Sequence, residues 1–502
     1  MKKLLLSLVV ILSVFSLTSC KEESIRTLKI YNWVDYIDES LLDEFIEYHA
    51  ENSNGERIEV IYDTFETNES MYNTLKTGKT NYDLVCPSDY MMQKMIREDM
   101  VEKLDLENYN LDEYYKNASP YIIDLFERND WDQYAVGYMW GTLGLIYNPS
   151  QLGELIGEEE YDIKSWNDLN NPAFKGTISL KDSVRDTFCV GSLIAFQDEL
   201  NKTKEQYGSD SKEYNELIQD IVNRVDDESI EIVSKELRKV KGNIYGLEVD
   251  SGKGDIVTGK IAVNLAWSGD AVYSIDLAEE EDIELRYTIP EEGGNVWFDA
   301  WLMPKGADKE LAQEFINFLS ISENAARNME EIGYTSIIAG DAIYNLIDEW
   351  YGKASNELFV EELQEEYNNN PTQENLDALN EAKEYAESAT YTTMDLTYFF
   401  KGTISDEYVT DGRVLIDIDD SYIGRQFTTQ YPDEISLNRC GVMQDFKEQN
   451  EKVLQMWINV KANEAPTWLY ITLVSGVILV ILGYLYSKRS YFARQRRFKK
   501  GS

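Results

Sequence analysis

Alternating strand-like and helix-like segments near the start of the chain restrict its fold most strongly. Short runs at 27–32, 57–62 and 82–86 predict strands, because apolar and aromatic residues dominate each of them. The segments between them, 40–49 and 68–77, carry apolar side chains at helical spacing. This strand-helix-strand order predicts a mostly parallel sheet covered by helices, which is an α/β fold.

Similar strand-like runs recur at 135–147, 176–180, 262–266 and 297–304. The chain has 502 residues, which is enough for two or more domains with sizeable cores. Residues 346–430 look inserted into this pattern. They begin with a Glu- and Asn-rich helical stretch and end with a Tyr- and Asp-rich strand-like one.

Three short motifs place an aromatic ring beside an acid: WVDY at 33–36, WSGD at 267–270 and WFD at 297–299. Aromatic faces attract ammonium groups with about 0.5 to 2 kcal/mol per contact. Carboxylates bind the same groups through charge-assisted hydrogen bonds. Each motif also has a structural interpretation, in which the ring belongs to the core and the acid caps a helix. Taken one at a time, the motifs leave both interpretations open.

Together with other motifs, they resemble the spermidine/putrescine-binding proteins of bacterial ABC transporters. The matching motifs follow one order along the chain: YNWVDY at 31–36, YDTFETNE at 62–69, YDLVCPSDY at 82–90, WGT at 140–142, SWNDL at 165–169, FKG at 174–176, PEEGG at 290–294, WFD at 297–299 and IGY at 332–334. The resemblance covers about 28–339 and resumes near 431.

The resemblance implies the two-lobed type II periplasmic-binding-protein fold, in which a hinge joins the lobes and ligand lies in the cleft between them. Crossover strands are expected near 138–144 and 297–302. Lobe 1 is expected at 27–140 and 299–345, with 431–464 returning to it. Lobe 2 is expected at 141–298, and the acidic insert occupies 346–430.

The resemblance also implies a set of ligand-binding residues. Trp267 and Trp297 are expected to stack on the methylene groups and nitrogens of a polyamine, and Asp299 to pair with an ammonium group. The complete expected set is Trp33, Tyr36, Ser88, Tyr90, Ser183, Asp186, Trp267, Trp297, Asp299, Tyr334 and Gln444. A flexible dication needs acids near its ends and flat apolar walls between them, so the residue types suit this ligand.

One departure from the family pattern concerns the run DSVRD at 182–186. The family's spermidine binders commonly carry two acids where this chain has Ser183 and Asp186, and Asp186 is one methylene shorter than the usual Glu. One carboxylate fewer weakens the case for a trication. It favours putrescine, or no preference between the two polyamines.

Both ends of the chain point to export and membrane attachment. Residues 1–20 read as a signal peptide that ends in a lipobox-like LTSC, where Cys20 would carry the lipid. An ordinary signal peptide with a stray cysteine is the alternative. Residues 467–486 contain no charge and are long enough to form a transmembrane helix. The basic tail at 487–502 is then cytoplasmic and the bulk of the chain lies outside.

Charge and composition exclude other classes of function. The net charge is −45, and removing the +2 of the first twenty residues and the +7 of the tail leaves −54. Such an acidic chain does not bind nucleic acid, which requires a basic face. His49 is the only histidine, and the four cysteines show no CxxC spacing. We therefore expect no metal site, no cofactor and no catalytic residues.

The sequence thus predicts a membrane-anchored extracellular protein that binds a polyamine by cleft closure and delivers it to an ABC transporter permease. Three alternatives remain open. The fold could serve a membrane-anchored sensor or a binder of another organic cation. A pair of acids could form a glycoside hydrolase, although nothing singles out such a pair. The third alternative is an Fe³⁺ site built from paired tyrosines, but no two adjacent tyrosines occur at the matching cleft positions.

Overall fold

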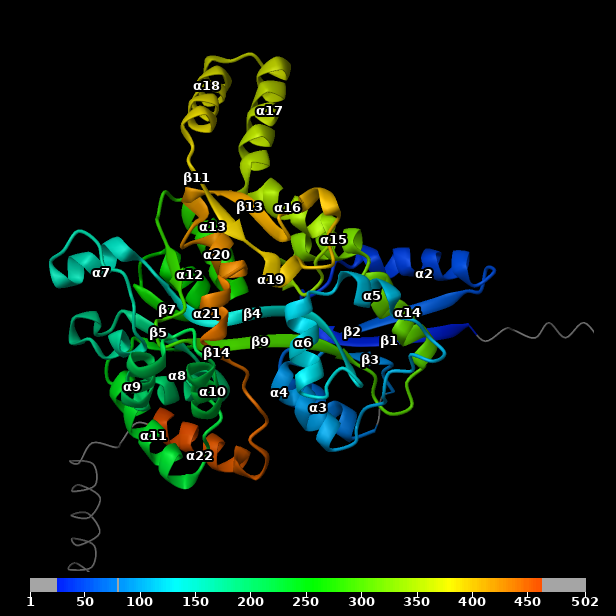
Figure 1. The fold of residues 1–502 in the computed structure, drawn as a ribbon, viewed down its shortest axis with the longest axis horizontal. Coiled ribbons are helices and arrows are strands. Elements are labelled where there is room, and N and C mark those ends of the chain that lie inside the picture. Colours follow the sequence, from blue (N-terminus) through cyan, green and yellow to red (C-terminus); the bar gives the residue numbers. More distant parts are fainter. Residues whose placement is uncertain (1–24, 79–80, 463–502) are drawn as a thin grey trace, which may run out of the picture. The chain divides into compact units, whose positions relative to one another are not determined.

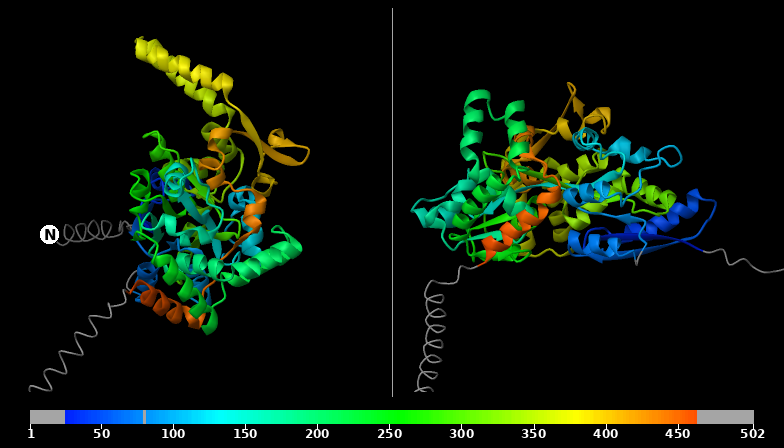
Figure 2. Two further views of the ribbon diagram at one scale, coloured as in Figure 1. Left: turned by 90° about the vertical axis from the view of Figure 1, so that its left-hand side faces the viewer. Right: turned by 90° about the horizontal axis from the view of Figure 1, so that it is seen from below.

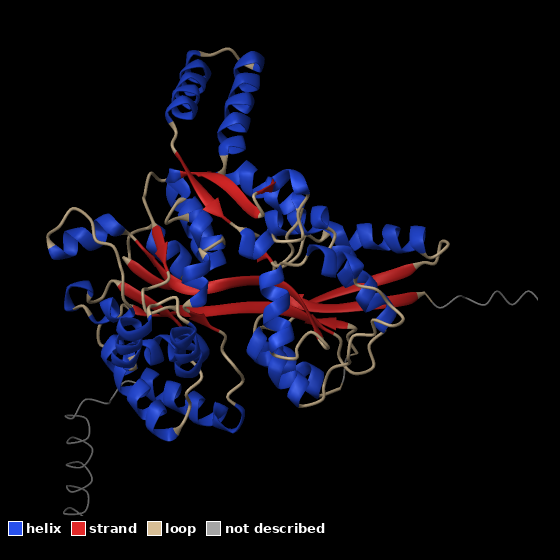
Figure 3. Ribbon diagram, in the orientation of Figure 1, coloured by secondary structure: helices blue, strands red, loops and turns tan. Residues whose placement is uncertain are grey.

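The computed structural model describes residues 25–78 and 81–462. They form a mixed α/β fold around one large sheet, with helices on both of its faces (Figures 1 and 3). The expected signal peptide with Cys20, the expected transmembrane helix at 467–486 and the tail at 487–502 lie outside the described residues. Within the described ranges, no helix combines the length and apolar character needed to cross a membrane.

The large sheet has eleven strands, and its main path runs in the order β2-β1-β3-β9-β4-β7-β5-β6. Strands β8 and β10 pair with β4, and β14 pairs with β9. The strands are β1 (Arg26–Trp33), β2 (Ile58–Phe65), β3 (Leu84–Val85), β4 (Ala135–Tyr147), β5 (Ile178–Lys181), β6 (Gly246–Glu248), β7 (Val263–Trp267), β8 (Arg286–Thr288), β9 (Gly294–Leu302), β10 (Thr335–Ser336) and β14 (Cys440–Gly441).

One half of the sheet, which we call lobe 1, contains β1 to β3 as parallel strands. The alternation predicted from the sequence is confirmed there by the helices between and after these strands. The helices around this half are α2 (Ser40–Asn52), α3 (Asn68–Lys76), α4 (Asp89–Arg97), α5 (Asp112–Asn117), α6 (Pro120–Arg128), α14 (Lys309–Leu319), α15 (Ser322–Ile332) and α16 (Asp341–Tyr351).

The other half, lobe 2, contains β5, β6 and β7, which are also parallel. Its helices are α7 (Pro149–Ile156), α8 (Val184–Ala195), α9 (Gln197–Tyr207), α10 (Lys212–Ile221), α11 (Asp227–Lys241), α12 (Gly252–Val257) and α13 (Ser268–Glu279). Helices α9 to α11 make the polar stretch at 199–241 largely helical.

Strands β4 and β9 run antiparallel and link the two halves. Val85 of β3 pairs with Leu302 at one end of β9, while Leu143 of β4 pairs with Trp267 of β7. All thirteen residues of β4 are buried, as expected for a strand with helices on both faces. The two strands therefore pass from one lobe to the other through the middle of the sheet.

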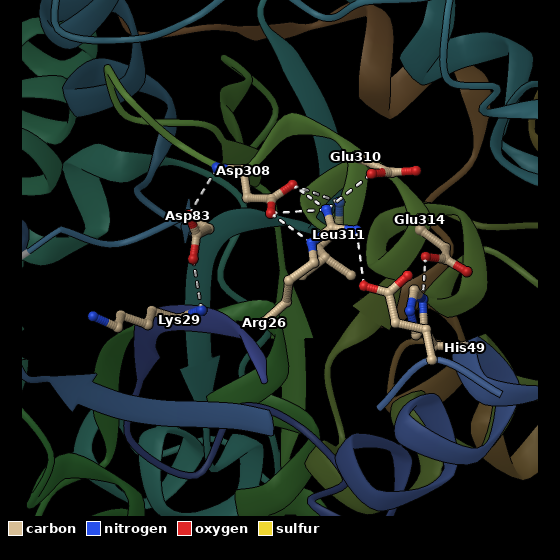
Figure 4. A network of polar contacts seen from close by, with 9 residues as sticks. Arg26, Lys29, His49, Asp83, Asp308, Glu310, Leu311 and Glu314 are labelled. Atoms are coloured by element: carbon tan, nitrogen blue, oxygen red, sulfur yellow. Dashed lines mark hydrogen bonds and ion pairs between the residues drawn. The ribbon is translucent and has the colours of Figure 1, made fainter. Parts of the chain in front are cut away.

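A network of ion pairs fixes the outer end of β1 (Figure 4). Arg26 contacts Asp308 at 2.8 Å and Glu310 at 2.9 Å. Asp308 is also the N-cap of α14 and accepts a hydrogen bond from the amide of Leu311. Asp83 accepts from the backbone amides of Lys29 and Asp308 and so joins β1 to the start of α14. His49 lies nearby, with Nδ1 2.7 Å from Glu314, and belongs to this structural network.

Residues 346–430 form a helical hairpin and a small three-stranded sheet of order β11-β13-β12. Helix α16 runs across position 346 without a break. The elements are α17 (Lys353–Asn369), α18 (Gln373–Ser388), β11 (Tyr391–Asp395), α19 (Thr397–Phe400), β12 (Val409–Thr410), β13 (Arg413–Asp419) and α20 (Gln426–Gln430). The α17–α18 hairpin projects from this region, as the left view of Figure 2 shows, and α17 contains no buried residue. Residues 370–372 separate the two helices of the hairpin.

Outside the hairpin, parts of this segment are buried against the lobes. Phe399 and Phe400 are fully buried and belong to the same apolar cluster as the lobe 1 core. On the other side, Arg425 contacts Glu279 at 2.6 Å, and Gln426 donates to Asp276 at 3.0 Å. Both acids belong to α13 of lobe 2. The segment therefore contacts both lobes on the face of the sheet that carries α13 and α16.

The chain then returns through α21 (Glu434–Asn438) and β14 to α22 (Asn450–Lys461). Between β14 and α22 it contacts both lobes again. Gln93 of α4 donates to the carbonyl of Met443 at 3.1 Å, and Gln219 of α10 donates to the carbonyl of Val442 at 2.8 Å. Cys86, Cys189 and Cys440 are buried free thiols.

Phe399 provides a test of the contact between the 346–430 segment and lobe 1. Its ring stacks on Trp140 of β4 at 5.7 Å and contacts Tyr431 at 5.3 Å. We expect Phe399→Ala to destabilise the protein by about 3 to 5 kcal/mol, because it leaves a cavity at a fully buried position. Denaturant unfolding measures the effect. The control Phe359→Ala removes a ring that is 54% exposed on α17 and should change stability little. Equal effects of the two substitutions would contradict this packing.

Candidate functional site

The carboxyl ends of the parallel strands in both lobes point toward the crossing strands β4 and β9. Trp33 ends β1, Ser88 follows β3, Ser183 follows β5 and Trp267 ends β7. Ligands of open α/β sheets bind at such strand ends. The topology therefore brings residues that lie far apart in the sequence to one region between the lobes.

Asp299 of β9 lies at the centre of this region and is 6% exposed. Its Oδ2 accepts a hydrogen bond from the hydroxyl of Tyr36 at 2.8 Å. Its backbone forms an isolated bridge with Ser88, which fixes the end of β3 beside it. Its Oδ1 is buried and accepts no hydrogen bond from any side chain or backbone group of the described chain. A buried carboxylate with one oxygen unused is prepared for a donor that the protein does not supply.

Burial raises the pKa of Asp299 from 3.8 to about 6, although the nearby hydroxyls of Ser88 and Tyr36 oppose this rise. Asp89, the first residue of α4, is 3% exposed. Burial raises its pKa to about 7, and the positive charge of Arg185 limits that rise. Its Oδ2 also has no hydrogen-bond partner within the described ranges. Both carboxyl groups would therefore be stabilised by a cation.

Aromatic rings surround Asp299. Tyr334 contacts Tyr36 edge-on at 5.6 Å and Trp297 at 5.8 Å. Gly269 allows the ring of Tyr334 to approach α13, because a Cβ at that position would lie 2.6 Å from the ring. These rings form apolar walls beside the carboxylate.

Trp33 and Trp267 lie at the ends of their strands and are half-buried. The Trp33 ring leans on Phe65 at 4.6 Å, and its indole Nε1 is buried without a hydrogen-bond partner among the described residues. The Trp267 ring is contacted by the ammonium group of Lys181, 4.7 Å from the ring centroid.

Two contacts join the lobes across this region. The hydroxyl of Tyr334 donates to Asp270 Oδ1 of α13 at 2.8 Å. The guanidinium of Arg185 in α8 stacks on the ring of Tyr90 in α4 at 4.7 Å. Because each contact pairs a lobe 1 residue with a lobe 2 residue, the structure has its lobes closed on one another at the site.

Arg185 is 8% exposed and also stacks on Phe446 at 4.1 Å. It donates to the backbone carbonyl of Gln444 at 2.5 Å, while its Nε and Nη1 lack hydrogen-bond partners in the described chain. Gln444 contributes this carbonyl, since the residue as a whole is exposed. The structure therefore places the backbone of Gln444, and not its side chain, in contact with the site.

Ser183 and Asp186 begin α8. Ser183 is the N-cap of the helix and accepts a hydrogen bond from the amide of Asp186 at 3.4 Å. Asp186 is 8% exposed. Burial raises its pKa, and neighbouring Ser183 and Trp267 oppose the rise. Asp186 thus lies next to Trp267, which connects the lobe 2 acids to the aromatic walls.

Sequence reasoning missed four charged residues of this region. Asp89 stands between two expected residues, and Arg185 stands beside Asp186. Lys181 and Glu248 end neighbouring strands and pair in register. A charged residue at the end of a short buried strand is unusual, and this feature of the sequence could have identified Lys181 as a site residue.

The arrangement suits the binding of an organic cation. It combines flat aromatic walls with buried carboxylates, and Asp299 and Asp89 each have an oxygen that accepts no hydrogen bond from the described chain. Over 25–78 and 81–462, no cluster of three or more His, Cys, Asp or Glu side chains could hold a metal ion.

Comparisons with known proteins agree with this fold. The family model for bacterial extracellular solute-binding proteins matches residues 45–343. The spermidine/putrescine-binding periplasmic protein of Escherichia coli is 30% identical over 312 residues, which are 62% of this chain and 77% of that protein. The putrescine-binding periplasmic protein of the same organism is 28% identical over 315 residues, 62% of this chain and 78% of the relative.

Among solved structures, the spermidine/putrescine ABC transporter substrate-binding protein of Streptococcus pneumoniae, in complex with calcium and HEPES, is similar with a TM-score of 0.55 and 25% identity. The match covers 87% of this chain and 98% of that one. The resemblance inferred from the motifs is confirmed, and so is the two-lobed α/β fold.

The raised pKa of Asp299 predicts a stability cost in the unliganded protein. A folded pKa of about 6 against 3.8 means that the folded state holds this proton more tightly. Stability from this group is therefore greatest below pH 4, falls between pH 4 and 6, and is lower by up to about 3 kcal/mol above that window. We expect Asp299→Asn to remove this fall and to raise the thermal unfolding midpoint at pH 7.5. The exposed Glu59→Gln serves as the charge-matched control. A midpoint for Asp299→Asn that falls at pH 7.5 would contradict the assignment.

Proposed function

The chain belongs to the family of bacterial extracellular solute-binding proteins, and we propose that it captures a polyamine between its lobes for an ABC transporter. As a member of this family it is a binding protein and not an enzyme, so the glycoside hydrolase alternative is wrong. Relatives named for binding spermidine and putrescine support the choice of ligand.

The observation that carries this proposal is the unused oxygen of Asp299. It is buried between tyrosine and tryptophan rings and accepts no hydrogen bond from the described chain. An ammonium group would supply the missing hydrogen bonds and the missing charge, and the rings would cover its methylene chain. Leaving such a carboxylate unpaired is costly, which makes a cationic ligand the natural complement.

In the proposed cycle, an open form binds the polyamine and the lobes then close around it. The contacts of Tyr334 with Asp270 and of Arg185 with Tyr90 would favour the closed state. The closed form would then dock on a membrane permease. Two segments would hold the protein near that permease, a lipid on Cys20 and a transmembrane helix at 467–486 that places the tail in the cytoplasm.

Binding of polyamine by the full-length chain in mild detergent tests the central proposal. Titration calorimetry with putrescine and spermidine is expected to give micromolar or tighter affinity. Asp299→Ala should weaken binding at least 100-fold, because removing a charged hydrogen-bonding partner from a buried site costs about 3 kcal/mol or more. The control is Asp276→Ala, which removes an exposed acid of α13 that contacts Gln426. The absence of heat and of a thermal shift with both polyamines would overturn the proposed function.

The two proposed anchors are tested by removing each one in cells. Cys20→Ala alone, or truncation after Glu464 alone, is expected to leave the protein in the membrane fraction, because either anchor suffices. The two changes together should release it. Release by Cys20→Ala alone would show that 467–486 does not span the membrane. Retention of the doubly changed protein would show that neither segment accounts for attachment.

A further inference from the structure

Lobe 2 carries a buried lysine at the edge of the proposed ligand site. Lys181 is the last residue of β5 and is 1% exposed. Its ammonium group lies 3.0 Å from Asp270 Oδ2, 3.2 Å from Glu248 Oε1 and 2.9 Å from the carbonyl oxygen of Val249. Two of these groups, Asp270 Oδ2 and the Val249 carbonyl, accept hydrogen bonds from the ammonium group, and Glu248 forms an ion pair with it, so the group is held in one place.

The same ammonium group lies over Trp267, 4.7 Å from the ring centroid. Trp267 is one of the two tryptophans expected to stack on a polyamine, and it adjoins Asp186. A ligand ammonium group binds favourably where an aromatic face covers it and carboxylates lie beside it. Here a side chain of the protein already occupies them.

Both carboxylate oxygens of Asp270, one of the partners of Lys181, are engaged by the protein itself. Asp270 Oδ2 accepts a hydrogen bond from Lys181, and Asp270 Oδ1 accepts one from the hydroxyl of Tyr334 at 2.8 Å. Lys181 cannot withdraw without leaving Asp270 and Glu248 as unpaired buried charges, which is strongly unfavourable. The lysine is therefore a fixed part of the site.

We propose that Lys181 is a built-in ammonium group that closes one end of the polyamine site and so selects a diamine over a longer triamine. This inference rests on the proposed function. A diamine would pair with the acids that remain, Asp299 and Asp186. A third ammonium group that reached toward Asp270 would meet the positive charge of Lys181 and find its acceptors taken.

Lys253 offers a matched control. Its ammonium group lies 3.8 Å from Asp270 and 2.7 Å from Asp250, and its side chain is 27% exposed. Lys253→Met removes a positive charge near the same acid without clearing the face of Trp267. Lys181→Met removes the charge that lies on that face and keeps a side chain of similar length.

The experiment measures the affinities of the full-length chain for putrescine and spermidine by calorimetry. The unchanged protein should bind putrescine more tightly. Lys181→Met should shift the ratio of the two affinities at least tenfold toward spermidine, and Lys253→Met should leave the ratio unchanged. In thermal unfolding, spermidine should stabilise Lys181→Met more than putrescine does, because its third ammonium group can replace the lysine.

If Lys181→Met does not fold, the double variant Lys181→Met/Asp270→Asn is used, because it removes both charges of this ion pair at once. Discrimination against spermidine should then decrease. An unchanged ratio in the folded variant overturns the role of Lys181 while the proposed function stands. A chain that binds neither polyamine overturns both.

Discussion

The antiparallel pairing of β4 with β9 is the constraint on which both lobes and the site depend. Met139 pairs with Asp299 and Gly141 with Trp297, so the central acid and one aromatic wall belong to the strands that cross between lobes. The register shifts between Gly137 and Met139, and Tyr138 occupies this bulge. Its hydroxyl donates to the carbonyl of Tyr36 and accepts from Asn328, which ties the loop after β1 to the crossing strands.

This placement explains how a hinged protein can keep a well-defined site. Groups on the crossing strands stay near the axis about which the lobes move, while Tyr334, Asp270, Tyr90 and Arg185 reach the site from either lobe. The 346–430 segment and the stretch at 442–445 also contact both lobes. Any opening of the cleft must therefore rearrange these outer contacts while the pairing of β4 with β9 persists.

Much of the fold could be predicted because local patterns determine it. The strands and helices of 27–86 follow from periodicity, and the WFD motif identified Trp297 and Asp299 as a pair. Other features depend on contacts between distant segments. Arg185 meets the carbonyl of Gln444, and Lys181 meets Glu248 and Asp270 only because β5, β6 and α13 converge. The sequence predicted an acidic insert at 346–430, but it did not predict that Phe399 and Phe400 of this insert belong to the lobe 1 core.

The excess of acid and the specificity of the site are separate properties. A net charge of −45 attracts cations in general, but exposed charges are screened over about 8 Å at physiological ionic strength. Such charges raise the rate of encounter and do not distinguish one polyamine from another. Discrimination requires desolvated groups at fixed positions, where each added or missing charge has a large energetic effect. Asp299 and Asp186 offer negative charge there, whereas Lys181 and Arg185 cancel part of it. The number of ammonium groups that the site can accept therefore depends on the balance of these few buried side chains.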